Sequence, residues 1–390
     1  MSALVPDELM AEARGLAGLD DFGRDSFREG LAVYCDSVNV EAQLNELGAT
    51  AIRSNIVGSL VNRLRIVGWA REHPLVVEER IDEPLIVIGM FRAGTTFLSY
   101  LLEQDEGNRA LLRWETGDSV PPPTPETLRT DPRVEVARFG NDLLEQINPR
   151  IRAIHHEEPD GPTECISLMS QDFKSLSWEA ISNVPTYGKW LLEVDQRSAY
   201  EYHRLALQVL QSGGVRGRWT LKSPHHALNL EALTAVYPDA RLVLLHRDPV
   251  VLCASVCSLI STLSATFSDA DHRAYIAEHW VAMLEESIRR IDAFRAAHPD
   301  HPIVDVQYAD LMRDPVGSVM AIYAAVDPGG PGIDQRVLEA MTAYVAAHPK
   351  NRLGVHGYDL SEFGLDSAQL TERFARYCSR YGVAPERAGR

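Results

Sequence analysis

The sequence is poor in cysteine, and its few cysteines show no disulfide or metal-binding pattern. The 390 residues include five cysteines, and no C-x-x-C pair occurs among them. This usage is typical of reduced cytosolic thiols rather than of a disulfide framework. Cys253 and Cys257 lie one helical turn apart, but no histidine or acidic residue is spaced to complete a metal site. We therefore expect them to pack in the core.

Basic residues are also scarce. Lysine and arginine total 38 against 55 aspartates and glutamates, which gives a formal net charge of −17. Nucleic acid and anionic membranes select clustered basic residues, so neither is expected as the main partner. Any anionic ligand must be held by a local basic pocket. The first residues lack the basic and apolar regions of a signal peptide, and no run of membrane-spanning length is expected. These features predict a cytoplasmic protein without a membrane-spanning segment.

What the chain does contain is enough apolar sequence, 45%, for a large core. One elaborated α/β domain is expected rather than several small ones. Apolar residues at helical spacing predict helices within 1–75, 133–214 and 226–237, and prolines interrupt regular structure at 121–125. Short apolar or β-branched runs predict strands at 85–88, 218–222, 241–246 and 303–308. Asp248-Pro249 and Asp314-Pro315 are helix starts, with an N-cap followed by proline.

Strands that alternate with helices predict a parallel sheet with right-handed crossovers, flanked by helices. The predicted organisation is an N-terminal helical segment over 1–82, packed on an α/β core over 83–325. That core carries a helical insert at about 121–214, and residues 326–390 form a C-terminal helical and loop cap. Ligands of such sheets bind at the carboxyl ends of the strands. Residues 89–96, 222–226 and 246–248 all lie at such ends.

The first strand ends in the spacing of a phosphate-binding loop, Gly89-x-x-x-x-Gly94, followed by a helical pattern over 95–104. The amides and the dipole of a helix N-terminus favour an anionic phosphate, and glycine lets the backbone approach it closely. An ATPase or GTPase needs a lysine after the second glycine to bridge the outer phosphates, but Thr95 stands there. The pattern thus predicts a phosphate loop that does not hydrolyse Mg-nucleotides, in which Arg92 is the cation.

Three motifs lie at these strand ends: Arg-Ala-Gly-Thr-Thr-Phe at 92–97, Leu-Lys-Ser-Pro-His-His at 221–226, and Arg247-Asp248-Pro249 with Ser255 eight residues after the arginine. In this order they resemble the motifs of sulfotransferases that use 3′-phosphoadenosine 5′-phosphosulfate (PAPS). The first resembles the 5′-phosphosulfate loop, the second the strand end that carries a lysine and a histidine, and the third the 3′-phosphate motif. Residues 306–315 and 351–365 resemble further segments of the family, the latter in bacterial, largely actinobacterial members. A P-loop-type α/β fold follows from the resemblance.

The resemblance also implies roles for individual residues. The implied donor-binding residues are Arg92, Ala93, Gly94, Thr95, Thr96, Phe97, Arg247, Ser255 and Arg352. In catalysis, Arg92 would meet the charge that grows on the leaving 5′-phosphate, and Lys222 would neutralise the sulfuryl oxygens. His226 is favoured as the base that takes the acceptor proton, with His225 and Glu164 as alternatives, and no metal is required. Two departures stand out: Phe91 replaces a proline, and Ala93 replaces a serine or threonine and removes one hydroxyl donor.

The sequence therefore predicts transfer of a sulfuryl group from PAPS to a hydroxyl of a small acceptor, with release of 3′-phosphoadenosine 5′-phosphate (PAP). The apolar helical segments favour an apolar or lipid-like acceptor, whereas a sulfated polysaccharide would favour a basic cleft. A nucleotide kinase is a second hypothesis, but it requires a lysine where Thr95 stands. A catalytically silent nucleotide-binding protein is a third, and Lys222 and His226 argue against it. The acceptor and the oligomeric state are left open.

Overall fold

The structure is a computed structural model that describes residues 3–154, 157–330, 332–349, 357 and 359–386. Within these residues a five-stranded sheet has the order β2-β3-β1-β4-β5, and every neighbouring pair is parallel. The strands are β1 (Leu85–Gly89), β2 (Asn108–Ala110), β3 (Arg218–Lys222), β4 (Arg241–His246) and β5 (Ile303–Gln307). The predicted α/β class with a parallel sheet is confirmed.

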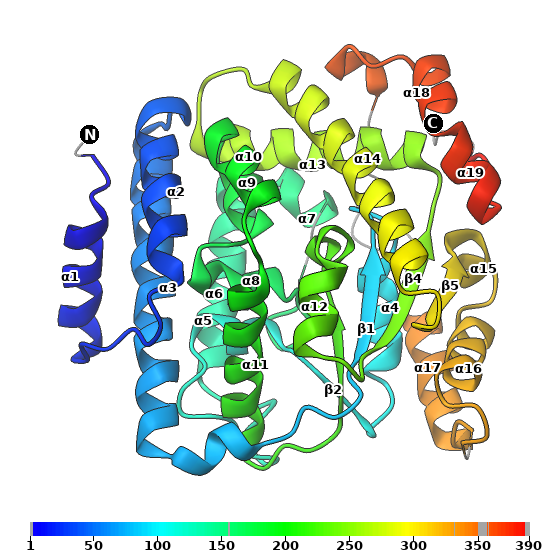
Figure 1. The fold of residues 1–390 in the computed structure, drawn as a ribbon, viewed down its shortest axis with the longest axis horizontal. Coiled ribbons are helices and arrows are strands. Elements are labelled where there is room, and N and C mark those ends of the chain that lie inside the picture. The colour runs from blue at the N-terminus through cyan, green and yellow to red at the C-terminus, as the bar shows by residue number, and fades with distance from the viewer. Residues whose placement is uncertain (1–2, 155–156, 331, 350–356, 358, 387–390) are drawn as a thin grey trace.

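Helices surround this sheet (Figure 1). Those before and beside the first strand are α1 (Pro6–Ala17), α2 (Phe27–Glu41), α3 (Glu46–Glu72), η1 (Pro74–Glu78) and α4 (Thr95–Leu102). Those of the insert and its approach are α5 (Arg113–Gly117), α6 (Arg133–Ile147), α7 (Arg150–Ile154), α8 (Ile166–Met169), η2 (Ser170–Asp172), α9 (Leu176–Ile181), α10 (Pro185–Glu193) and α11 (Arg197–Ser212). The last group is η3 (Pro224–Leu228), α12 (Leu230–Val236), α13 (Pro249–Phe267), α14 (Arg273–Ala297), α15 (Tyr308–Arg313), α16 (Pro315–Val326), α17 (Gln335–Ala347), η4 (Leu360–Phe363), α18 (Ser367–Arg373) and α19 (Ala375–Tyr381).

Strand β1 shows how the sheet is covered on both faces. Successive strand residues point to opposite faces. Leu85 and Val87 belong to a core cluster with residues of α4, α16 and α17, whereas Ile86 and Ile88 belong to one with residues of α11 and α12. Burial on both faces explains why this strand reads as a continuous apolar run rather than as an alternation.

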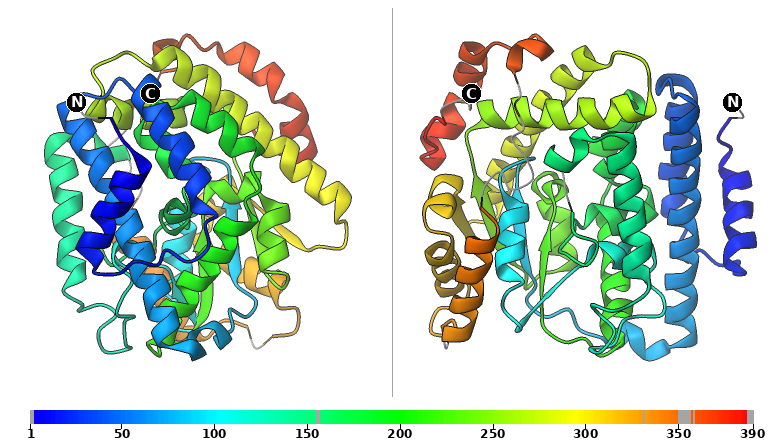
Figure 2. Two further views of the ribbon diagram at one scale, coloured as in Figure 1. Left: turned by 60° about the vertical axis from the view of Figure 1, so that its left-hand side comes forward. Right: turned by 180° about the vertical axis from the view of Figure 1, so that it is seen from behind.

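The N-terminal helices lie at the far side of the molecule from α18 and α19 (Figure 1, and from behind in Figure 2). Helix α3 packs against α11 and α13. A third cluster of buried apolar residues joins α2 and α3 to α9, α13 and α14 above the carboxyl ends of the strands. The helical pattern expected over 1–75 is thus confirmed, while the division of the chain near residues 82 and 325 stays a prediction.

Three local expectations need correction. Strand β2 was missed because three residues carry too little pattern to identify. The helix expected over 226–237 is a 3₁₀ turn, η3, followed by α12, because Asn229 (φ −138°, ψ 35°) interrupts the helical backbone. Helix α13 does reach membrane-spanning length, with a mean hydropathy of 2.0, but 72% of that window is buried inside the protein. Its composition reflects a place in the core.

Candidate functional site

A cavity of about 890 Å³ opens at the carboxyl ends of the strands. Its polar wall comes from the turn after β1, the turn after β4 and the segment before α8. Its apolar wall comes from α9, α13 and α14. Residues that line it include Arg92, Gly94, Thr95, Thr96, Phe97, Glu164, Arg247 and Tyr308, and on the apolar side Leu176, Leu259, Leu263 and Trp280. Most of the residues singled out in the sequence therefore meet in one place.

The turn after β1 has the tight backbone of an anion-binding loop. Gly94, with φ +100°, is the N-cap of α4, and Arg92 is also left-handed, with φ +68°. A Cβ on Gly94 would lie 2.8 Å from the Tyr308 ring, so only glycine fits there. The first amides of α4 have no carbonyl partner within their own helix. The cavity therefore faces a helix N-terminus suited to a phosphate or sulfate.

The loop and the second motif are in direct contact. The Arg92 Nε donates a hydrogen bond to Ser255 Oγ at 3.2 Å, and the Arg247 Nη1 donates to the backbone oxygen of Arg92 at 2.9 Å. Asp248 caps α13 by accepting from the Val250 amide at 2.9 Å, and Pro249 starts that helix. The predicted cap thus fixes where α13 begins and brings Ser255, two turns later, next to the loop.

Arg247 is held on three sides. Its Nε and Nη2 donate to the two carboxylate oxygens of Glu386 at 2.8 and 3.0 Å, and its guanidinium lies 3.9 Å from the centre of the Tyr308 ring. Neither Tyr308 nor Glu386 was predicted from the sequence as a site residue. No motif marks a glutamate so near the C-terminus, and only the folded chain brings it to Arg247.

Lys222 and Glu164 form the second charged element of the site. The Lys222 Nζ lies 3.2 Å from Glu164 Oε1, and the side chains are 1% and 15% exposed. The Cys165 amide donates to the Lys222 backbone oxygen at 2.9 Å, which fixes the Glu164 segment at the end of β3. Glu164 lines the cavity; Lys222 lies behind it. The Lys222 side chain is therefore linked to the cavity by its contact with the Glu164 carboxylate.

His225 and His226 lie elsewhere. Both are 1% exposed within η3, and neither is among the described residues that line the cavity. The His226 Nδ1 shares a hydrogen bond with the Tyr200 hydroxyl at 2.9 Å, and its Nε2 has no hydrogen-bond partner among the described residues. Burial lowers the pKa of His226 well below its ordinary value. The position of His226 therefore gives no support to its role as the base.

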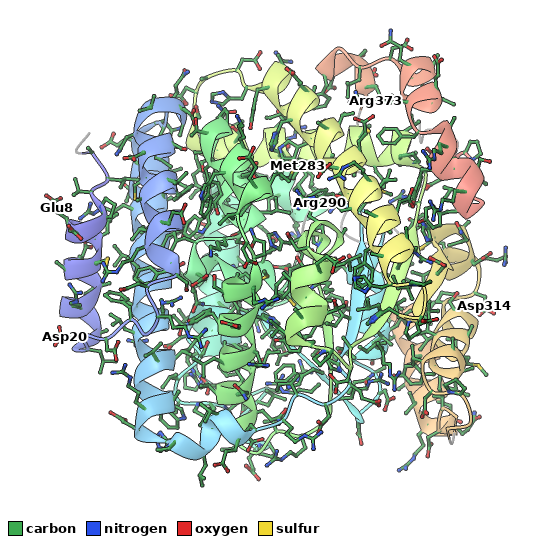
Figure 3. All side chains as sticks on the ribbon, viewed as in Figure 1. Glu8, Asp20, Met283, Arg290, Asp314 and Arg373 are labelled. Atoms are coloured by element: carbon green, nitrogen blue, oxygen red, sulfur yellow. The ribbon has the colours of Figure 1, made fainter. Side chains whose placement is uncertain are left out.

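Burial also lowers the pKa of His225 to about 3, with a smaller contribution from the Arg290 cation. Arg290 extends from α14 over this turn and donates to the Leu228 backbone oxygen at 2.9 Å (Figure 3). The buried His203, whose Nδ1 lies 2.7 Å from the Tyr237 hydroxyl, likewise has a pKa lowered by burial to about 3. The fold thus keeps several histidines neutral.

These buried histidines predict how stability depends on pH. An unfolded histidine has a pKa of about 6.5, so between that value and about 3 the unfolded chain binds more protons than the folded one. The histidine contribution to stability is therefore full above pH 6.5 and is lost as pH falls, by about 1.4 kcal/mol per pH unit for each histidine. Urea unfolding at about pH 7 and about pH 5 measures this slope. His203→Phe should reduce the slope of stability against pH by the contribution of one histidine. An unchanged slope would contradict the lowered pKa of His203.

The remaining loop residues take distinct places. Ala93 is fully buried, while Thr96 and Phe97 line the cavity. Phe97 also packs against the apolar cluster beneath α4. Phe91, which replaces a proline, makes an edge-to-face contact with Trp280 at 4.9 Å between ring centres. The Phe91 side chain therefore forms part of the apolar wall of the cavity. Arg352 lies outside the described residues.

Comparisons with known proteins identify the family of the chain. A model of the sulfotransferase family matches residues 84–328. The crystal structure of sulfotransferase STF9 from Mycobacterium avium is 34% identical, with a TM-score of 0.89 over 98% of each chain. Sulfotransferase STF1 from Mycobacterium tuberculosis H37Rv is 33% identical, with a TM-score of 0.85 over 96% of this chain and 99% of that one.

Among known sequences, the omega-hydroxy-beta-dihydromenaquinone-9 sulfotransferase Stf3 of Mycobacterium tuberculosis (strain CDC 1551 / Oshkosh) is 23% identical over 313 residues. The match covers 77% of this chain and 75% of that protein. The family model covers more than half of the chain, and it includes the loop, the Lys222 strand end and the Arg247 motif. The chain belongs to the sulfotransferase family.

Proposed function

We propose that this sulfotransferase transfers the sulfuryl group of PAPS to a hydroxyl of a lipid-like acceptor and releases PAP. One observation carries the proposal: two elements suited to anions, the loop at Gly94 and Arg247 with the buried Ser255, meet at Arg92, and the loop and Arg247 line one cavity beside an apolar wall. PAPS needs both elements because it carries a phosphosulfate at its 5′ end and a second phosphate at its 3′ position. ATP lacks the second group.

The donor would lie along the polar wall. The first amides of α4 and the Thr95 and Thr96 hydroxyls supply donors for the 5′-phosphosulfate. Arg247 and Ser255 supply charge-assisted and neutral hydrogen bonds for the 3′-phosphate. Arg92, whose backbone and side chain contact these two residues, is the cation placed to meet charge on the leaving 5′-phosphate.

The transfer step is an in-line displacement, by analogy with phosphoryl transfer. The acceptor oxygen attacks sulfur, the bond from sulfur to the 5′-phosphate oxygen breaks, and the electron pair leaves with PAP. We assign the acceptor proton to the Glu164 carboxylate because it lines the cavity, whereas His226 is buried against Tyr200. Lys222 orients this carboxylate through its 3.2 Å contact. No metal ion is needed in this scheme.

The acceptor would lie against the apolar wall formed by α9, α13 and α14. This wall includes Leu176, Leu259, Leu263 and Trp280, which match an apolar rather than a sugar-like molecule. The related Stf3 is named for a hydroxylated menaquinone, a long apolar molecule with a single attacking hydroxyl. A lipid-like alcohol is therefore the acceptor class that we propose. The free thiols are consistent with action in the cytoplasm.

Calorimetry with PAP and AMP tests the donor assignment. We expect PAP to bind more tightly than AMP, and Arg247→Ala to weaken PAP binding about 10- to 100-fold while AMP binding is unchanged, because a charge-assisted hydrogen bond is lost. Arg241→Ala, at the opposite end of the same strand, is the matched control and should leave both affinities unchanged. Equal binding of PAP and AMP by the wild-type protein would contradict the proposal.

A further inference from the structure

Glu386 accepts hydrogen bonds from the Nε and Nη2 edge of the Arg247 guanidinium, the edge that a phosphate would also bind. Its two carboxylate oxygens accept from Arg247 Nε and Nη2 at 2.8 and 3.0 Å, which is the paired geometry that guanidinium offers to carboxylates and phosphates alike. Because Nη1 already donates to the Arg92 backbone, the Nε and Nη2 edge is the one that would otherwise grip an anion. A carboxylate therefore occupies the edge of the Arg247 guanidinium to which we assign the 3′-phosphate.

The C-terminal segment holds Glu386 in this position through several contacts. The Glu386 amide donates to Asp248 Oδ2 at 2.8 Å, next to Arg247 in the chain. Upstream, the Tyr377 hydroxyl of α19 lies 2.9 Å from His246 Nδ1, and the Tyr381 backbone oxygen accepts from Gln307 Nε2 at 2.8 Å. Helix α19 accordingly lies beside the ends of β4 and β5 (Figure 1). The tail is thus anchored at the donor side of the sheet.

The Arg247–Glu386 pair is also placed so that it can open. The Glu386 side chain is 27% exposed, against 13% for Arg247. Breaking the pair therefore returns a carboxylate to water rather than leaving it in an apolar interior. The contacts of Arg247 with Tyr308 and with the Arg92 backbone do not involve Glu386, so they are available to hold the guanidinium when the carboxylate departs. The guanidinium is then already oriented for another anion.

We propose that Glu386 competes with the 3′-phosphate of the donor for Arg247, so that this C-terminal glutamate sets the affinity for PAPS and PAP. The inference rests on the donor site proposed above. Two anions cannot share one guanidinium edge, and the apparent dissociation constant rises in inverse proportion to the fraction of molecules in which that edge is open. If Glu386 holds Arg247 in about nine molecules of ten, PAP binding is weakened about tenfold.

Titration calorimetry of the full chain with PAP and with AMP tests this competition. We expect Glu386→Ala to tighten PAP binding roughly three- to tenfold, and Glu386→Gln, which keeps the size but removes the charge, to shift it in the same direction. AMP has no 3′-phosphate, so its affinity should not change, and that constancy also shows that the rest of the donor site is folded. Glu372→Ala, an exposed glutamate of α18, is the matched control for the charge change.

The possible outcomes separate this inference from the proposed function. Unchanged or weaker PAP binding in both Glu386 variants would overturn the competition, since Glu386 would then be inert or would position Arg247. Equal tightening for PAP and AMP would also overturn it, because the tail would then act on the whole nucleotide. If the wild-type protein does not prefer PAP to AMP, the donor assignment itself fails. If the wild-type protein prefers PAP and the Glu386 variants bind PAP with unchanged affinity, only the competition is contradicted.

Discussion

Replacement of Glu164 by glutamine is expected to lower the turnover number by about 10²- to 10⁴-fold, the usual contribution of a general base. The reason is positional: this carboxylate lines the cavity to which we assign the acceptor, and it contacts Lys222 at 3.2 Å. Glutamine keeps the size and an oxygen that can accept from Lys222, so the change removes mainly the ability to take a proton. PAP affinity should be unchanged, because Glu164 is not among the residues that we propose for binding the 3′-phosphate.

The measurement is turnover of labelled PAPS with a saturating long-chain alcohol, together with PAP calorimetry on the same samples. His226→Gln is the informative comparison. It should keep the turnover number of the folded protein within about threefold of wild type, since His226 acts through packing against Tyr200 rather than through contact with substrate. If Glu164→Gln retains activity and His226→Gln loses it, the base is the histidine and the Glu164 assignment is wrong.

Replacement of Arg63 by methionine is expected to destabilise the protein by about 3–5 kcal/mol, the typical cost of leaving one partner of a buried ion pair uncompensated. The Arg63 side chain is 2% exposed, and its Nη1 lies 2.9 Å from Asp172, which is fully buried. It also donates to the backbone oxygens of Phe22 and Arg24, both at 2.9 Å. Asp172 in turn accepts from the Ser26 and Ser198 hydroxyls. This ion pair joins the N-terminal helices to the insert.

A control lies two residues along the same helix. Arg65 makes an ion pair with Asp118 at the same 2.9 Å, but both side chains are more than a third exposed. Arg65→Met should therefore cost only about 0–1 kcal/mol. Urea unfolding of the two variants measures the difference. The double variant Arg63→Met with Asp172→Leu should be less destabilised than Arg63→Met alone, because the buried carboxylate that Arg63 neutralises is removed as well. Lys174, which lies 4.0 Å from Asp172, keeps its hydrogen bond to Ser198 in this variant. Equal losses in the free energy of unfolding for Arg63→Met and Arg65→Met would show that burial of the Arg63–Asp172 pair does not increase its contribution to stability.

Much of the fold follows from local sequence, as the strands around the site illustrate. Strands β1, β3, β4 and β5 are predicted within one residue of their observed ends. For β1 and β4 the reason is a continuous apolar run, which marks a strand buried on both faces. The starts of α13 and α16 are predicted from aspartate-proline pairs, whose side chains cap the helices as expected. Strand β2 was not predicted, since its three residues are defined by pairing with the distant strand β3. The break at Asn229 was not predicted either.

The sequence by itself determined the anion loop, the Arg247 and Ser255 spacing and the alternation that builds a parallel sheet. These are short-range patterns, and the sheet brings its strand ends to one edge whatever surrounds them. Only the tertiary structure decided which candidate base reaches the cavity. The sequence favours His226 over Glu164, but Glu164 lines the cavity in contact with Lys222, whereas His226 is buried against Tyr200. Glu386 likewise meets Arg247 across 139 positions of sequence. Contacts of that range are set by how helices pack, which no local pattern records.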